Sequence, residues 1–339
     1  MPLGPGGASD ILVVRLSSFG DVVLAEPAVR ELARAFPAHR IGFASHTAYA
    51  AIPTMFAGVG EVVEVPRPDH PGSRRARGPE GDYRVIVDLQ NSLRSRAWIR
   101  SLRAERVLRY SRPWARRLVC VYLPWLWKGQ LEHTVDLYLK ALRPLGVNGE
   151  ASAPRLAVPD GARSDAIQDL GDGPWVGVCP GGSSPHKMWP ADRFAELARR
   201  LVASGHKVVA LGSEADRSQV EAVLGGAGGR GVAGFIRNDP VAVAAALSLC
   251  VVTVSNDSGL MHLAEGVGSR VVGIFGPTSP LLGFAPLSPD SAAVSRHAPC
   301  SPCSYHGNRP CRYRSPFCLE EIQPSDVASI VDRLAGRSA

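Results

Sequence analysis

Three loops of the sequence combine glycine, hydroxyl and charged residues in patterns that suit the binding of an anion. One of them, SNDSGLMHLAEG (255–266), follows an apolar, β-branched run and leads into a helical pattern. Asp257, Ser258 and Gly259 therefore stand where a strand ends and a helix begins, with His262 one turn later. The first turn of a helix offers N–H groups without helical partners and the positive end of the helix dipole. Because a simple cap needs only one of these residues, we interpret the segment as a phosphate site.

The second loop is CPGGSSPHKMWP (179–190), which also follows an apolar strand pattern. Gly181 and Gly182 allow backbone N–H groups to approach an anion, Ser183 adds a hydroxyl donor and Lys187 adds a positive charge. The spacing does not match the Walker A motif. The simpler alternative is a turn, rich in glycine and proline, that precedes a helix.

The third loop, LGSEAD (211–216), places Gly212 at a strand end and offers the carboxylates of Glu214 and Asp216. Two helix N-termini with glycine and hydroxyl residues suit a diphosphate, and a nearby carboxylate suits ribose hydroxyls. The pattern does not distinguish Glu214 from Asp216 for that role. The second half of the chain is therefore predicted to hold a nucleoside diphosphate, which indicates transfer from a nucleotide sugar.

A carboxylate that could act as a base lies near the start of the chain. The segment RLSSFGDVVLAEPA (15–28) joins a strand to a helix and contains Asp21. Its single glycine excludes the dinucleotide-binding fingerprint and disfavours a dehydrogenase. Either Ser17, Ser18 and Asp21 cap the helix, or Asp21 serves as a general base.

Alternating strand and helix patterns predict an α/β fold. Two such arrays indicate two Rossmann-like domains that face a central cleft, with a sequence poor in periodicity between them. The expected division is an N-terminal acceptor-side domain (1–155), a linker (156–172), a nucleotide-sugar-binding domain (173–323) and a C-terminal helix (324–339). Expected strands cover 11–16, 41–46, 61–66, 85–90, 155–158, 175–182, 207–213, 250–255 and 270–277, and expected helices cover 22–35, 191–205, 241–250 and 324–337.

The amino-acid composition and charge narrow the classes of binding partner to expect. The chain has 339 residues and a net charge of +7, and thirteen arginines stand against four acids between Arg74 and Arg117. Such a cluster suits nucleic acid, anionic lipid or a phosphorylated saccharide, unless it is only a solvated face. The leader MPLGPGGASD has neither the basic nor the apolar region of a signal peptide, and no apolar run is long enough to span a membrane. We therefore expect a cytoplasmic protein.

Two further segments leave alternatives open. Cys300, Cys303, Cys311 and Cys318 begin with a C-x2-C pair, so they could form a tetrahedral zinc site or a reduced loop. The run SRPWARRLVCVYLPWLWKG (111–129) mixes arginine with Trp and Tyr, which fits a helix on a membrane surface or a core helix with a basic edge.

Four segments together resemble glycosyltransferase family 9, the ADP-heptose:lipopolysaccharide heptosyltransferases of the GT-B fold. They cover about a quarter of the chain, in the family's order. CPGG and NDSGLMH look more like the heptosyltransferase II branch than the heptosyltransferase I branch. The segments are RLSSFGDVVLAEPAVRELARAFP (15–37), CPGGSSPHKMWPADRFAELARRL (179–201), VVALGSEAD (208–216) and SNDSGLMHLAEGVGSRVVGIFGPTSP (255–280).

The resemblance implies an inverting, metal-independent transfer of heptose from ADP-heptose to a heptosyl-Kdo2-lipid A acceptor, with no cofactor. It implies that Asp21 is the catalytic base and that Arg94 and Arg96 bind the acceptor. It places Asn238 near the adenine. The donor would be held by Gly181, Gly182, Ser183, Lys187, Gly212, Glu214 or Asp216, Asp257, Ser258, Gly259 and His262.

The resemblance also implies that the protein works at the inner membrane surface as a peripheral protein, where the lipopolysaccharide acceptor lies. Two alternatives remain: a family member with another sugar or acceptor, and a catalytically idle nucleotide-binding regulator of envelope assembly. Nucleic-acid binding is not expected, because the arginines lack the aromatic stacking pattern of known modules.

Overall fold

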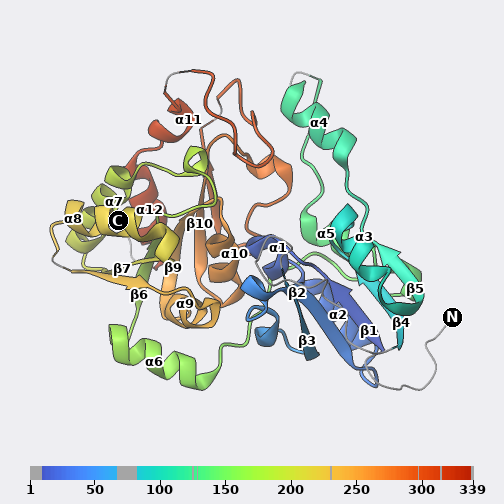
Figure 1. The fold of residues 1–339 in the computed structure, drawn as a ribbon. Helices are drawn as coiled ribbons and strands as arrows, with labels where there is room; N and C mark the ends of the chain where they lie inside the picture. Colours follow the sequence, from blue (N-terminus) through green and yellow to red (C-terminus); the bar gives the residue numbers. More distant parts are fainter. Residues whose placement is uncertain are drawn as a thin grey trace. The chain divides into compact units, whose positions relative to one another are not determined.

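The computed structural model describes residues 10–336 apart from 67–81, 124–125, 128, 230, 297 and 314. The leader and the first arginines of the basic run lie outside the described residues. The chain forms two compact units, Met1–Arg112 with Thr134–Ala157 and Pro113–His133 with Val158–Ala339 (Figure 1). The sequence places residues 113–133 in the N-terminal domain, whereas in the structure they group with the second unit.

The first unit contains a five-stranded parallel sheet in the order β3-β2-β1-β4-β5. The chain runs outward from β1 first to one side and then to the other, so the order reverses between β1 and β4. In such sheets ligands bind at the carboxyl ends of the strands beside this reversal. The strands are β1 (Ile11–Val14), β2 (Ile41–His46), β3 (Val59–Val65), β4 (Asp82–Asp88) and β5 (Arg103–Arg109).

Short helices join these strands. The single helix expected over 22–35 is two helices, α1 (Phe19–Val23) and α2 (Glu26–Ala35). Pro27 explains the break, because it has no N–H to continue the hydrogen bonding of α1 and is favoured in the first turn of a new helix. Asp21 therefore lies within the short helix α1, rather than just before the single helix that the sequence predicts. Helix α3 (Leu93–Ile99) lies between β4 and β5, and α5 (Thr134–Lys140) follows the last strand of this sheet.

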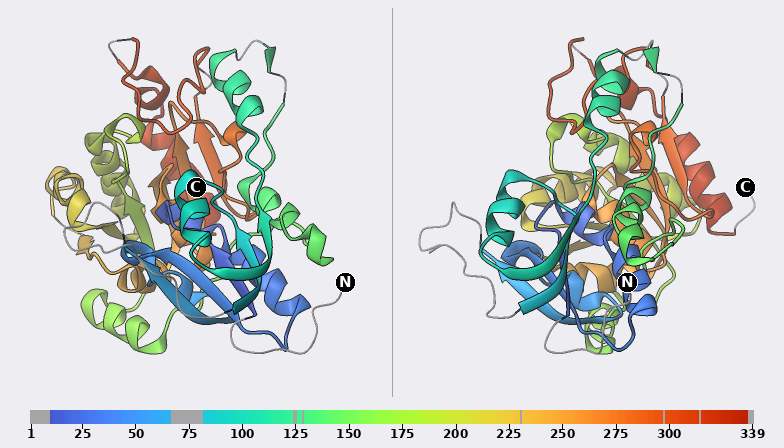
Figure 2. Two further views of the ribbon diagram at one scale, coloured as in Figure 1. Left: turned by 45° about the vertical axis from the view of Figure 1, so that its right-hand side comes forward. Right: turned by 90° about the vertical axis from the view of Figure 1, so that its right-hand side faces the viewer.

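The second unit contains a six-stranded parallel sheet in the order β11-β10-β9-β6-β7-β8. Its order reverses between β6 and β9, which gives a second site of the kind just described. The two views in Figure 2 show helices on both faces of this sheet. The strands are β6 (Trp175–Cys179), β7 (Lys207–Gly212), β8 (Val232–Ile236), β9 (Cys250–Asn256), β10 (Arg270–Phe275) and β11 (Ala292–Ser295).

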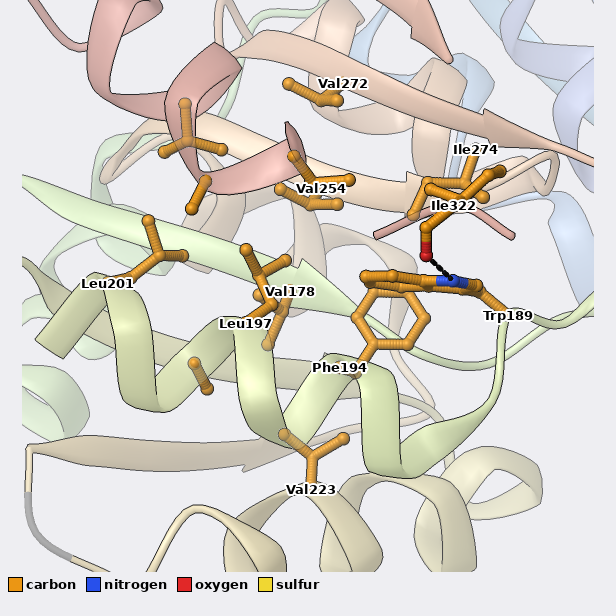
Figure 3. Packing of buried hydrophobic residues seen from close by; sticks show 14 of the residues in the cluster. Val178, Trp189, Phe194, Leu197, Leu201, Val223, Val254, Val272, Ile274 and Ile322 are labelled. Atoms are coloured by element: carbon orange, nitrogen blue, oxygen red, sulfur yellow. Dashed lines mark hydrogen bonds between the residues drawn. The ribbon is translucent and has the colours of Figure 1, made fainter. Parts of the chain in front are cut away.

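One face of this sheet packs against α7 (Ala191–Ala203), α8 (Arg217–Gly226) and α12 (Pro324–Leu334) in a large apolar cluster (Figure 3). Side chains alternate between faces along a strand. Gly273 of β10 therefore faces the other side, where Met261 of α10 (Gly259–Gly266) lies against it. α9 (Pro240–Leu247) is the remaining helix between β8 and β9.

Two elements around the predicted linker depart from the sequence expectation. The linker contains a helix, α6 (Asp160–Leu170), in which Ala166 is the buried residue. Because it buries so little, it has no apolar stripe to reveal it in the sequence. The short strand expected at 155–158 is a single bridge between Leu156 and Phe56. The second unit also contains the short helices α4 (Trp114–Tyr122) and α11 (Phe317–Glu320).

Within the described residues, every helix is too short or too polar to cross a lipid bilayer.

Candidate active site

Asp21 is held by donors on one oxygen and is nearly open on the other. Oδ2 is 2.7 Å from Arg15 Nη2 and accepts hydrogen bonds from the Ser18 hydroxyl (2.7 Å) and N–H (3.2 Å). Oδ1 accepts only a long hydrogen bond from the Tyr138 hydroxyl, at 3.4 Å, among the interactions of the described residues. The side chain is 19% exposed. Asp21 thus takes part in the cap of α1, as one prediction had it, and still presents an oxygen that can receive a proton.

Two opposing effects set the pKa of Asp21. Burial by itself raises the pKa of this carboxyl. The Arg15 guanidinium and the hydrogen bonds from Ser18 outweigh burial, so that the pKa lies below its usual value. Asp21 is therefore a carboxylate at neutral pH, the form that a general base requires.

Gln90 fixes the loop that carries Asp21, and the sequence analysis did not assign it a role. Its Oε1 accepts hydrogen bonds from the N–H groups of Leu16 (2.9 Å) and Ser17 (3.0 Å), and its Nε2 donates to Ser17 Oγ (3.1 Å). These bonds join the carboxyl end of β1 to that of β4. The available signal was the polar stretch DLQNS directly after a strand.

The two arginines predicted for the acceptor follow the same strand end. Arg94 and Arg96 are exposed on α3, and Arg96 Nε donates to Asn91 Oδ1 at 2.9 Å. The start of α3 is anchored by Ser95, whose hydroxyl donates to Asp88 Oδ2 (3.0 Å). The first unit thus presents Asp21 and these two cations at the ends of the adjacent strands β1 and β4.

In the second unit, the predicted donor loops follow the three neighbouring strands β9, β6 and β7. Lys187, in a turn after β6, lies with Nζ 3.4 Å from Oδ2 of Asp257, which follows β9. Ser258 is the N-cap residue of α10 and Gly259 its first residue, and His262 is buried one turn into that helix. The fold therefore brings a cation, a carboxylate and a helix N-terminus to one place.

Asn256 connects two of these loops. It is fully buried, and its Nδ2 donates to the carbonyl groups of Pro180 (2.8 Å) and Gly181 (3.0 Å). Its Oδ1 accepts a hydrogen bond from the N–H of Trp189 at 2.9 Å. One amide thus holds both ends of the 180–189 loop, a role that was not predicted although Asn256 lies in the quoted motif.

Asp216 packs beneath the glycine loop. A Cβ at Gly181 would overlap the Asp216 carboxylate, and one at Gly212 would lie 2.8 Å from Asp216 Cβ. Asp216 Oδ2 accepts hydrogen bonds from the Ser213 N–H (3.0 Å) and hydroxyl (2.7 Å). The close packing explains why glycine is needed at both positions.

The remaining predicted donor residues are more exposed. Glu214 forms an ion pair with Arg217 at 2.8 Å, and its N–H donates to Asn238 Oδ1 at 3.0 Å. Ser183 is exposed and Gly182 is half-buried. The geometry thus brings Asn238 to the turn that carries Glu214.

The four clustered cysteines differ in exposure. Cys300 and Cys303 are half-buried, Cys311 is exposed and Cys318 is buried. Burial, together with the other three thiols, raises the pKa of Cys318 to about 11, so its thiol is neutral at pH 7. Across the described part of the chain, no three His, Cys, Asp or Glu side chains are gathered closely enough to hold a metal ion.

Helix α4 has two distinct faces. Cys120 and Val121 are buried in a cluster with Leu131 and Leu282 of the second unit. Trp114, Leu118 and Tyr122, spaced four residues apart, are exposed on the outer face. The buried face agrees with a helix that packs against the core, and contact of the exposed face with a membrane stays a prediction. Trp125, part of the same run, lies outside the described residues.

Comparison with known proteins decides the family. The model of glycosyltransferase family 9 (heptosyltransferase) matches residues 79–313. The chain belongs to this family. The two-sheet α/β architecture agrees, because E. coli heptosyltransferase WaaC with ADP superposes with a TM-score of 0.73 at 19% identity, over 96% of this chain and 99% of that one. The fold class predicted from the sequence, GT-B, is confirmed.

Relatives of both heptosyltransferase types match. Lipopolysaccharide heptosyltransferase 2 of Escherichia coli (strain K12) is 34% identical over 153 residues, and that match spans 42% of this chain and 43% of that protein. Lipopolysaccharide heptosyltransferase 1 of Pseudomonas aeruginosa (strain PAO1) is 27% identical over 361 residues, 96% of this chain and 97% of that protein. The chain thus aligns with less than half of the E. coli protein and with nearly all of the P. aeruginosa protein.

Proposed function

We propose that this family 9 member transfers heptose from ADP-heptose to the inner core of lipopolysaccharide, with a heptosyl-Kdo2-lipid A type of acceptor. The observation that carries the proposal is the meeting of Lys187, Asp257 and the N-terminus of α10. A cation and free N–H groups at one point suit a diphosphate. A structural relative contains ADP, and others are lipopolysaccharide heptosyltransferases by name.

On this proposal the donor phosphates bind at the start of α10. Lys187 then exchanges its partner, Asp257, for the phosphate oxygens, and the N–H groups that follow Ser258 complete the binding. Gly181, Gly182 and Ser183 line the same site, with Gly212 and either Glu214 or Asp216 toward the ribose and His262 beneath. These groups are fixed before the reaction, so they stabilise the charge that develops on the departing ADP.

Asp21 is the proposed general base. Its Oδ1 accepts the proton of the acceptor hydroxyl as the hydroxyl oxygen bonds to C1 of heptose and the bond from C1 to the phosphate oxygen breaks. Direct attack opposite the leaving group inverts the configuration at C1. Because Lys187 and the helix N-terminus neutralise the leaving group, the proposed reaction needs no metal ion.

The acceptor is proposed to bind through Arg94 and Arg96, whose charges suit the phosphates and carboxylates of the inner core. The outer face of α4 is proposed to rest on the membrane that carries the acceptor. Exposed Trp114, Leu118 and Tyr122, with the guanidinium of Arg309 over the Tyr122 ring, form the mixture of aromatic, aliphatic and basic residues that favours a lipid–water interface. The protein would then work as a peripheral protein on the cytoplasmic side of the inner membrane.

The deciding experiment measures ADP release from ADP-heptose by purified protein, with and without heptosyl-Kdo2-lipid A. Release should require the acceptor and should fall about 10²- to 10⁴-fold in Asp21→Asn. ADP should still bind to that variant, because the proposed nucleotide site lies wholly in the second unit. The anomeric configuration of the product, read by NMR, tests inversion, and addition of a chelator tests independence of metal.

Other outcomes point to the alternatives. Turnover with another nucleotide sugar or another acceptor would show that the protein has a different activity within the family. Binding of ADP without turnover on any inner-core acceptor would favour the idle nucleotide-binding regulator. A protein that binds no ADP would contradict both proposals.

A further inference from the structure

The cysteine loop, residues 300–318, is anchored at the carboxyl edge of the second sheet. The hydroxyl of Ser301 donates to the carbonyl of Gly276 at 2.9 Å, and the N–H of Cys303 donates to the carbonyl of Pro277 at 3.0 Å. Gly276 and Pro277 directly follow β10. This end of the loop therefore stands beside the end of β9, the neighbouring strand.

The middle of the same loop reaches the turn after β6. The hydroxyl of Ser184 donates to the carbonyl of Gly307 at 2.6 Å. Because β9 lies between β10 and β6, the loop passes from one neighbour of the Asp257 strand to the other. The loop therefore spans the strand ends where the donor residues stand.

Gly307 lies directly against the side chain of Lys187. Its φ is +65°, and a Cβ placed there would overlap Cγ and Cδ of Lys187. The stem of Lys187 is thus confined by Gly307, while its ammonium lies 3.4 Å from Asp257. A lysine stem has four rotatable bonds, and ordering it during binding costs entropy that prior confinement avoids.

We propose that Gly307 is a positioning residue of the donor site: the cysteine loop holds the stem of Lys187 so that its ammonium faces the diphosphate. The diphosphate in this statement rests on the proposed function, whereas the packing of Gly307 on Lys187 does not. Gly307 touches no reacting atom and acts through Lys187. The loop acquires a role that requires neither a metal ion nor a disulfide.

The test compares Gly307→Ala with Gly228→Ala. Gly228 also has a positive φ, +79°, in the second unit, but a Cβ there meets nothing within 4 Å. The substitution therefore imposes a similar backbone strain without the overlap. Circular dichroism and thermal unfolding establish that both variants are folded.

The first readout needs no nucleotide. Acylation of lysine amines by a small reagent, mapped by mass spectrometry, should modify Lys187 several-fold faster in Gly307→Ala than in the wild type, with Lys207 as internal reference. Gly228→Ala should match the wild type. Should Gly307→Ala fail to fold, Ser184→Ala removes the loop anchor instead and should give the same change to a smaller degree.

The second readout is the affinity for ADP and for adenosine, measured by calorimetry. ADP should bind about tenfold more weakly to Gly307→Ala, while the affinity for adenosine changes less than about twofold. Lys187→Ala removes the overlapping atoms, so adding Gly307→Ala to it should weaken ADP binding by less than about twofold.

Unchanged acylation of Lys187 in Gly307→Ala and Ser184→Ala would overturn the proposal. An equal loss of ADP affinity in the Lys187→Ala background would do the same, because Gly307 would then act through something else. A wild-type protein that binds no ADP would overturn the proposed function, and the acylation result would then decide the positioning of Lys187 by itself.

Discussion

Arg15 and Asp21 form an ion pair of 2.7 Å in which the cation is the more deeply buried partner. Arg15 is also fixed by a hydrogen bond from Nη1 to the carbonyl of Leu89 (2.7 Å) and lies over the ring of Tyr138. Its charge therefore cannot move away from Asp21 without breaking other contacts. The candidate base is thus kept ionised by a fixed neighbour.

Replacing Arg15 by Gln should move the acid limb of the pH profile of kcat/KM to higher pH. In the wild type, the Arg15 guanidinium and the hydrogen bonds from Ser18 lower the pKa of Asp21, so the base stays ionised into the acid range. Without the guanidinium, the effect of burial is less well opposed and the pKa of Asp21 rises. Rates of ADP release measured across the acid range report the shift.

Arg15→Lys is the control, because it retains a charge and should shift the acid limb less.

The ion pair of Arg15 and Asp21 also predicts a pH-dependent stability. Because the pKa of Asp21 is lower in the folded state, the pair stabilises the fold above the unfolded-state pKa, and this contribution is lost as the pH falls through the folded-state pKa. Urea unfolding at neutral and acid pH should show the gap between wild type and Arg15→Gln narrowing in acid. A constant gap would contradict the assignment.

Gly181→Ala should disturb the donor site more than Gly182→Ala. A Cβ at Gly181 overlaps the Asp216 carboxylate, whereas one at Gly182 lies 3.2 Å from Met188 Cγ, in a flexible side chain. The first change should cost about 1–3 kcal/mol of stability and weaken ADP binding. Thermal unfolding and calorimetry measure both effects.

A second substitution tests whether Asp216 is the cause. Asp216→Ala removes both the carboxylate oxygens and the Cγ that the new methyl would overlap, so in that background Gly181→Ala should recover part of the lost stability. Equal behaviour of the Gly181 and Gly182 variants, or no recovery in the double variant, would show that the overlap is not what limits position 181.

The strands that line the candidate sites were readable from the sequence because they are buried. The cores of β1, β6, β9 and β10 are continuous apolar runs, and each ends in residues of recognisable chemistry. Strand β5, RAERVLR, was missed, because it lies at a sheet edge and is largely exposed, so its pattern is charged rather than apolar.

The residues that position the sites were harder to predict. Gln90 and Asn256 bond to partners more than 70 positions away in the chain, and Arg15, although its ion-pair partner Asp21 is close in sequence, is anchored by the equally distant carbonyl of Leu89. Nothing in their local sequence specifies those partners, because the contacts depend on which strands are neighbours. The glycines could be assigned to tight loops from their type alone, but the side chain that each glycine accommodates could not.

Asn256→Asp should weaken ADP binding, although the two side chains are nearly equal in size. The carboxylate can still accept from the N–H of Trp189, but its second oxygen would face the carbonyl oxygens of Pro180 and Gly181 without a donor. Each buried polar group left without a partner costs about 1–3 kcal/mol. A fall in both ADP affinity and unfolding temperature is expected. Asn256→Gln is the control for the amide, and wild-type affinity in Asn256→Asp would contradict the role.

The outer face of α4 should bind anionic vesicles. Replacing Trp114 and Leu118 by Ser removes exposed apolar surface, 68% and 46% accessible, from the helix. Binding to vesicles of phosphatidylglycerol and phosphatidylethanolamine, measured by sedimentation, should fall about tenfold or more. Turnover of a soluble, delipidated acceptor should be unchanged. Val251→Ser alters an exposed apolar residue elsewhere in the second unit and should bind vesicles as the wild type does. Wild-type binding by the α4 variant would contradict the proposal that the outer face of α4 rests on the membrane.

Trp189 should be the most costly single position in the core of the second unit. Its indole is fully buried, packs edge-on against Phe194 with ring centres 4.9 Å apart and donates from Nε1 to the carbonyl of Ile322 at 3.3 Å (Figure 3). Trp189→Ala removes this packing and should cost about 3–5 kcal/mol in the free energy of unfolding. Denaturant unfolding measures the loss.

Trp189→Phe is the control, because it keeps most of the ring contact and should lose less stability. Its affinity for ADP should persist, because the N–H that bonds to Asn256 belongs to the backbone. An equal loss in both variants would show that the hydrogen bond to Ile322, rather than packing, holds the indole in place.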